Sequence, residues 1–267
     1  SQESAAASQE EGTLSPSSGS STFTDNSDSS MDNVLSQVQS LLPTDNGTWS
    51  VYVCNLAKNT EGSINDQQMQ AASLIKLYIM GAVYENYDQI TGQYGRDSVD
   101  SNLYSMITVS DNDAANTLTT YLGGGDSAAG MQAVNSFCQA HGYDQTHMGR
   151  MLLASNENDD NYTSVGDCGH LLQEIYKQDT SGYTHAADMF NLLKAQTRCN
   201  KIPAPLPDGV KTANKTGELD NVENDAGIIY DSKNDVVIVF MSQNLSSAGS
   251  AQNTIATLSR TIYDYYN

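Results

Sequence analysis

The feature that most constrains the fold is the segment from Ala71 to Met80, which is almost wholly apolar except for Ser73 and Lys76. Its length and its Ala, Leu and Met content predict a buried helix that extends to about Tyr87. The i, i+3 spacing places Ser73 and Lys76 on one face of this helix. Burial lowers the pKa of a lysine, so Lys76 could accept the proton of the Ser73 hydroxyl. The alternative is a capping serine beside a lysine whose head group reaches solvent, and this motif alone does not decide between them.

Strand patterns lie at both ends of the chain, and helix patterns lie between them. Strands are predicted at 49–57, 210–217, 225–231 and 235–242, with terminal helices at 31–42 and 250–265. Further helices are predicted at 103–109, 113–121, 128–139, 165–177 and 185–197. This order predicts an α+β fold, in which an antiparallel sheet is flanked by the N- and C-terminal helices and carries an inserted all-helical lobe.

The predicted domain organisation is a tether followed by one domain. Residues 1–30 are rich in Ser, Ala and Glu and contain almost no large apolar side chain, which predicts a flexible tether. The domain spans 31–267, with a sheet lobe at 31–66 plus 208–267 and a helical lobe at 67–207. A tether suits an exported protein held at a cell surface, through a lipid-modified segment upstream of Ser1. We therefore expect an extracellular or cell-surface location.

Charge and cysteine content exclude several classes of partner. The formal net charge of -20 repels nucleic acid and anionic lipid, and no run of apolar residues is long enough to span a membrane. The four histidines are scattered without metal-ligand spacing, so neither a metal nor another cofactor is expected. In an exported protein we favour a Cys168–Cys199 disulfide over other pairings with Cys54 and Cys138, and buried free thiols are the alternative. We expect a monomer.

Two further motifs follow the first in order: Ser110-Asp111-Asn112, in a loop between predicted helices, and Lys215-Thr216-Gly217, at the end of a predicted strand. Each tripeptide is expected by chance in only about one chain in tens, so the ordered set is informative. With these motifs, the chain from about residue 31 onward resembles the penicillin-recognising serine enzymes, specifically class A β-lactamases and their D,D-peptidase relatives.

The resemblance implies a role for each motif residue. Ser73 would be the nucleophile that forms an acyl-enzyme, Lys76 its proton partner, and Ser110 the relay to the leaving nitrogen. Lys215 would be the fourth catalytic residue, because it would hold a positive field near Ser110. The same resemblance implies that four further positions, Asn112, Thr216, Gly217 and Glu218, bind substrate. Asn112 would bind the amide side chain of the substrate, and Lys215 and Thr216 its carboxylate. Gly217 precedes Glu218, whose backbone N–H would complete an oxyanion hole with that of Ser73.

The chain departs from the class A pattern where the deacylating glutamate is expected. That glutamate lies two residues after an arginine, and the position two residues after Arg150 is Leu152. Glu157, in the same loop, is a substitute candidate. The resemblance implies a β-lactamase-like serine hydrolase acting on β-lactams or related amides. The alternatives are a peptidoglycan D,D-carboxypeptidase that acts on stem peptides, a surface lactam sensor that does not turn over, and an unrelated Ser-Lys esterase or amidase.

Overall fold

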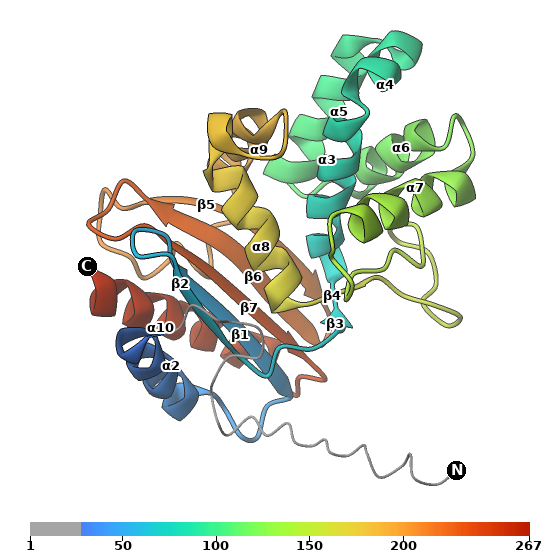
Figure 1. The fold of residues 1–267 in the computed structure, drawn as a ribbon. Helices are drawn as coiled ribbons and strands as arrows, with labels where there is room; N and C mark the ends of the chain where they lie inside the picture. Colours follow the sequence, from blue (N-terminus) through green and yellow to red (C-terminus); the bar gives the residue numbers. More distant parts are fainter. Residues whose placement is uncertain (1–27) are drawn as a thin grey trace, which may run out of the picture.

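A five-stranded antiparallel sheet forms the centre of the protein (Figure 1). The computed structural model describes residues 28–267. The strand order is β2-β1-β7-β6-β5, with bounds β1 Thr48–Asn55, β2 Thr60–Ile64, β5 Lys211–Leu219, β6 Val222–Tyr230 and β7 Val236–Gln243. Strand β1 pairs with β7 along its whole length, so the first strand of the domain lies beside the last.

Helices cover both faces of this sheet because its strands are apolar on both sides. In β7, Ile238 and Phe240 pack into the core shared with α2 (Ser29–Leu41) and α10 (Ala248–Tyr266). Val237 and Val239 alternate with them and pack on the opposite face, where α8 (Val165–Tyr176) crosses the sheet (Figure 1).

Most of the remaining helices pack around α3 (Ile75–Glu85), in which every residue except Glu85 is buried. A 3₁₀ turn, η2 (Ala72–Leu74), precedes α3, and a second one, η3, spans Gln178–Thr180. The helices around α3 are α4 (Tyr87–Tyr94), α5 (Arg96–Thr108), α6 (Asn112–Leu122) and α7 (Ser127–Ala140), whereas α9 (Ala186–Ala195) packs against α5, α8 and β5. A short two-stranded sheet, β3 (Met69–Gln70) with β4 (Tyr162–Thr163), ties the start of this region to the loop before α8.

The predicted fold class is confirmed, with differences at several boundaries. The predicted 71–87 helix is divided into η2 and α3, and the short strands β2, β3 and β4 had no recognised pattern. Most of the predicted tether, residues 1–27, lies outside the described residues, whereas Ser29 and Ser30 already belong to α2. The division into two lobes stays a prediction. Within residues 28–267, no helix combines the length and the apolar character needed to cross a bilayer.

The preferred disulfide is wrong. All four cysteines are free thiols. The preferred pair does not form because Cys168 is buried inside α8, whereas Cys199 is exposed in the segment after α9. The alternative interpretation, buried thiols acting as small apolar side chains, describes Cys54, Cys138 and Cys168. Burial raises the pKa of Cys54 and of Cys168 to about 12, which keeps both thiols protonated and inert.

Candidate active site

Ser73 lies in a strained turn that is held from two sides. Ala72 has a φ of +48°, a left-handed conformation that alanine rarely adopts. The preceding residue, Ala71, donates its N–H to the Asn161 carbonyl at 2.9 Å, and its own carbonyl accepts from Asn224 Nδ2 at 3.1 Å. These two hydrogen bonds keep the backbone of the turn in its strained conformation. Ser73 is partly exposed just before the buried helix.

Lys76 is fully buried beneath Ser73 and is surrounded by oxygen atoms. Its Nζ lies 3.0 Å from Ser73 Oγ, 3.0 Å from Ser110 Oγ, 2.7 Å from the Ser110 carbonyl and 2.8 Å from Asn112 Oδ1. The carbonyl and amide oxygens can only accept, so they take both N–H bonds of a neutral amine and leave its lone pair for a serine hydroxyl. Burial, reinforced by the charge of Arg198, lowers the pKa of Lys76 from 10.5 to about 7.

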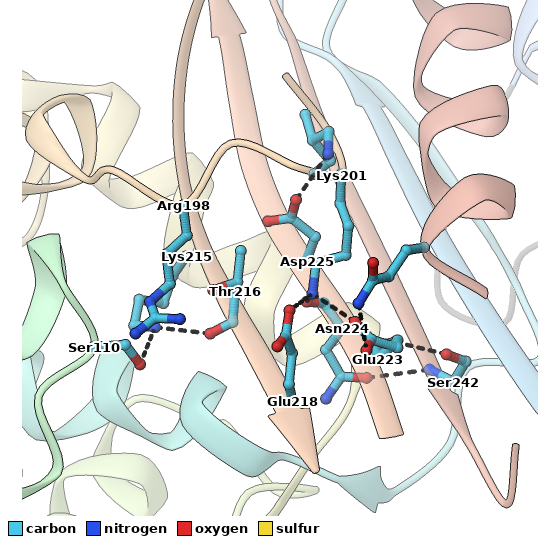
Figure 2. Close-up of polar contacts among 12 residues, drawn as sticks. Ser110, Arg198, Lys201, Lys215, Thr216, Glu218, Glu223, Asn224, Asp225 and Ser242 are labelled. Atoms are coloured by element: carbon cyan, nitrogen blue, oxygen red, sulfur yellow. Dashed lines mark hydrogen bonds and ion pairs between the residues drawn. The ribbon is translucent and has the colours of Figure 1, made fainter. Parts of the chain in front are cut away.

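Ser110 connects Lys76 to the second lysine of the site. It also has a positive φ, +58°, and its Oγ accepts from Lys215 Nζ at 2.9 Å (Figure 2). Lys215 is almost fully buried on β5 and donates a further bond to the Thr216 carbonyl at 2.7 Å. Burial, together with the nearby charge of Lys76, holds the pKa of Lys215 well below its usual range. One hydroxyl therefore lies between two amines, an arrangement suited to proton relay.

Strand β5 brings the third motif against the turn of Ser73. A side chain at Gly217 would place its Cβ 2.9 Å from the Ala71 carbonyl and 3.1 Å from the Ser73 nitrogen, so only glycine allows this approach. Among residues 28–267, β5 is an edge strand, so alternate backbone N–H groups on its outer side have no strand partner there. The next residue, Glu218, lines the same cleft as Ser73.

The cleft beside Ser73 has a volume of about 360 Å³ and is closed on one side by the loop after α7. Leu152 lines it, and Asn116 brackets the Leu152 backbone, donating to its carbonyl at 3.0 Å and accepting from its N–H at 2.9 Å. Glu157 is exposed and lies outside the cleft lining, so the structure does not bring the substitute carboxylate to Ser73. Within residues 28–267, no group of three or more His, Cys, Asp or Glu is placed to hold a metal ion.

This fold and arrangement match a known family. The model of the beta-lactamase enzyme family matches residues 33–94 and 92–266. The chain belongs to the beta-lactamase enzyme family. The family identifies a hydrolase of the beta-lactamase type. No curated protein matches the chain.

Solved structures share the fold at low sequence identity. PBP-A superposes with a TM-score of 0.75 at 23% identity, covering 87% of this chain and 95% of its own. An ancestral class A beta-lactamase has a TM-score of 0.74 at 20% identity, with 86% and 99% of the two chains covered. A beta-lactamase from Sphaerobacter thermophilus has a TM-score of 0.72 at 20% identity, with 86% and 95% covered.

The structure also brings in residues that sequence reasoning missed. Arg198, in the segment after α9, lies beside Lys215 and Ser110 (Figure 2) and donates to the Val109 carbonyl at 3.0 Å. Its exposed guanidinium adds a permanent positive charge beside the two buried lysines. Lys201 forms ion pairs with Glu218 of β5 and Glu223 of β6 (Figure 2). Single charged residues in an irregular, proline-containing segment form no local pattern, so nothing in the sequence singled them out.

Proposed function

We propose that the protein is a serine hydrolase that forms an acyl-enzyme on Ser73 with β-lactams or related amides. The observation that carries the proposal is the position of Lys76 Nζ, 3.0 Å from the hydroxyls of both Ser73 and Ser110. The neutral amine takes the Ser73 proton while Ser73 Oγ bonds to the substrate carbonyl carbon. The C–N bond then breaks, Ser110 passes its proton to the leaving nitrogen, and Lys76 returns a proton to Ser110.

Cations and backbone donors beside these groups suit an anionic amide substrate. Lys215, Thr216 and Arg198 border the place where a substrate carboxylate would lie, and the positive charge of Arg198 offsets the field of a chain with a net charge of -20. Asn112 supplies an amide for the acyl side chain of the substrate, although its Oδ1 is already bonded to Lys76. The backbone N–H groups of Ser73 and Glu218 are the candidate oxyanion donors.

We further propose that a penicillin acyl-enzyme persists. Hydrolysis of the acyl-enzyme needs a base to activate water, and Leu152 occupies the place where class A enzymes carry that base. Glu218 is the only carboxylate among the cleft-lining residues, and its side chain is paired with Lys201 at 2.9 Å. The expected behaviour is that of a penicillin-binding D,D-peptidase, which is the second candidate function. The structural neighbour PBP-A has been solved as a penicillin G acyl-enzyme in a variant that replaces a leucine by glutamate.

Intact mass spectrometry with penicillin G tests both parts. The protein should gain the mass of one penicillin within seconds to minutes and keep it for hours, and Ser73→Ala should gain none. Leu152→Glu should acylate like the unmodified protein and lose the adduct faster, whereas Glu157→Gln should change neither step. Rapid release of hydrolysed penicillin by the unmodified protein would refute the persistent acyl-enzyme. The absence of any adduct or product would remove lactams as substrates.

A further inference from the structure

A third buried lysine, Lys201, lies outside the groups assigned to the reaction. Lys201 has no exposed surface, and its Nζ lies 2.9 Å from Glu218 Oε2, 2.9 Å from Glu223 Oε1 and 3.0 Å from the Asn224 carbonyl (Figure 2). Three acceptors match the three N–H bonds of an ammonium group, so the charge is fully satisfied. Although partial burial opposes ionisation, the charge of Lys201 lowers the pKa of Glu218.

Lys201 lies between the carboxylates of two neighbouring strands, β5 and β6, which would otherwise repel each other. Glu218 on β5 and Glu223 on β6 are directly opposite each other in the antiparallel register, near the end of the hairpin. Like charges in this relation destabilise a strand pair. Glu223 is buried and also accepts from Gln252 Nε2 at 3.0 Å, so it cannot turn away into solvent. The ammonium group of Lys201 therefore holds together the strand end that carries the Glu218 N–H.

The same stretch of β6 also holds the turn of Ser73. Asn224 Nδ2 donates to the carbonyls of Gln70 at 3.0 Å and Ala71 at 3.1 Å, and its Oδ1 accepts from the Ser242 N–H at 3.1 Å. Asn224 is fully buried, so this amide has a fixed orientation. Its neighbour Glu223 and its own carbonyl are both bound by Lys201. One buried network thus contacts both segments that would supply oxyanion donors.

We propose that Lys201, acting with Glu223 and Asn224, is a positioning group that fixes the backbone N–H of Glu218 relative to that of Ser73. This proposal rests on the proposed function, in which the two N–H groups bind the developing oxyanion. Donors from separate segments stabilise a transition state only when both point at one oxygen atom, and an error of about 1 Å costs about 100-fold in rate.

The test replaces the ion pair by neutral side chains. Removing Lys201 alone would leave the Glu223 carboxylate buried and unpaired, which is strongly destabilising. The variant is therefore Lys201→Met combined with Glu223→Gln. We expect its acylation rate constant at saturating penicillin G to fall about 10- to 100-fold, because the oxyanion donors separate. The dissociation constant of the initial penicillin complex and the melting temperature should change little.

A second readout does not depend on lactams. Phenylboronic acid forms a tetrahedral adduct on a nucleophilic serine, and one of its oxygens would occupy the oxyanion position. Its dissociation constant should rise by the factor lost in acylation, and Lys201→Arg should recover most of both. The matched control is Lys211→Met, which removes an exposed ion pair with Asp231 at the opposite end of β5 from Glu218 and should change neither value.

The outcomes separate this proposal from the proposed function. If the unmodified protein binds phenylboronic acid but is not acylated by penicillin, the lactam assignment fails and the boronate ratio still tests the positioning role. Unchanged boronate binding and acylation in the double variant would overturn the positioning role. A double variant in which initial penicillin binding is weakened, acylation is slowed and the melting temperature falls would also overturn it, since this combination indicates general structural damage. Binding of neither ligand by the unmodified protein would overturn both proposals.

Discussion

The pH dependence of acylation should report the ionisation of Lys76. Burial lowers the pKa of Lys76 from 10.5 to about 7. An ordinary lysine is neutral in about one molecule in 3,000 at pH 7, whereas Lys76 is neutral in about half, a gain of about 1,500-fold in available base. The same shift corresponds to about 5 kcal/mol of differential stabilisation between the two protonation states. Burial therefore makes Lys76 available as a neutral amine, and so as a base, near pH 7.

The assay is the second-order rate constant for acylation by penicillin G, measured by stopped flow between pH 5 and 9. The rate should fall on the acidic side with an apparent pKa of about 7, and at pH 5 it should be about 1% of its plateau. Arg198→Gln removes a charge that lowers the pKa of Lys76, so the acidic limb should move to higher pH.

A matched control is Arg96→Gln, which removes an exposed arginine on α5 whose partner is Asp100. This variant should leave the acidic limb in place. A rate that does not change between pH 5 and 8 would refute the assignment of Lys76 as the base. A limb that moves equally in both arginine variants would refute the local origin of the shift.

Three further predictions follow from single positions. Gly217→Ala forces a Cβ to within 2.9 Å of the Ala71 carbonyl and should lower the acylation rate about 100-fold in the same stopped-flow assay. The control is Gly249→Ala, whose Cβ meets open space in α10, and it should acylate at the normal rate. Equal rates in the two variants would contradict the steric argument. Asn116→Ala removes both hydrogen bonds to the Leu152 backbone and should slow acylation. The control Asn135→Ala removes the equivalent pair of hydrogen bonds to Met148, which lies outside the cleft lining, and should lower only the melting temperature. Equal losses of acylation rate in the two variants would contradict a specific role of the loop. Because the pKa of Lys76 is lower in the folded chain than in the unfolded chain, ionised Lys76 destabilises the fold fully below pH 7, and this cost declines as pH rises from about 7 to 10.5. Lys76→Met should therefore abolish acylation and raise the melting temperature more at pH 6 than at pH 9, and a larger gain at pH 9 would contradict this sign.

Long periodic segments and rare motifs allowed the main features to be predicted. The α+β class followed from strand patterns at both ends of the chain, and three short motifs identified the residues that meet around Lys76. The fold prediction succeeded because β6, β7 and α10 have clear burial patterns, whereas the roles of the motif residues stay predictions. The left-handed φ of Ala72 was not predictable, since alanine ordinarily avoids this conformation and only tertiary contacts hold it.

The remaining errors arise where distant segments meet. Cys168 and Cys199 are reasonable disulfide partners by cysteine count, but one belongs to a buried helix and the other to an exposed segment. Glu157 belongs to the correct loop, but it faces solvent there. Glu218 and Glu223 become neighbours of Lys201 only through the hairpin register, which no local pattern of charges specifies.

The pairing of β1 with β7 also affects the order in which the site can form. Residues 48–55 find their partner only when residues 236–243 have been synthesised, and the Gln70 N–H, just before the turn of Ser73, bonds to the side chain of Gln243. Contacts of such long sequence separation form late, because closing a large loop is entropically costly. A growing chain that already contains all three motifs therefore still lacks a completed site. We therefore expect a nascent protein of this architecture to stay inactive until its synthesis is nearly finished.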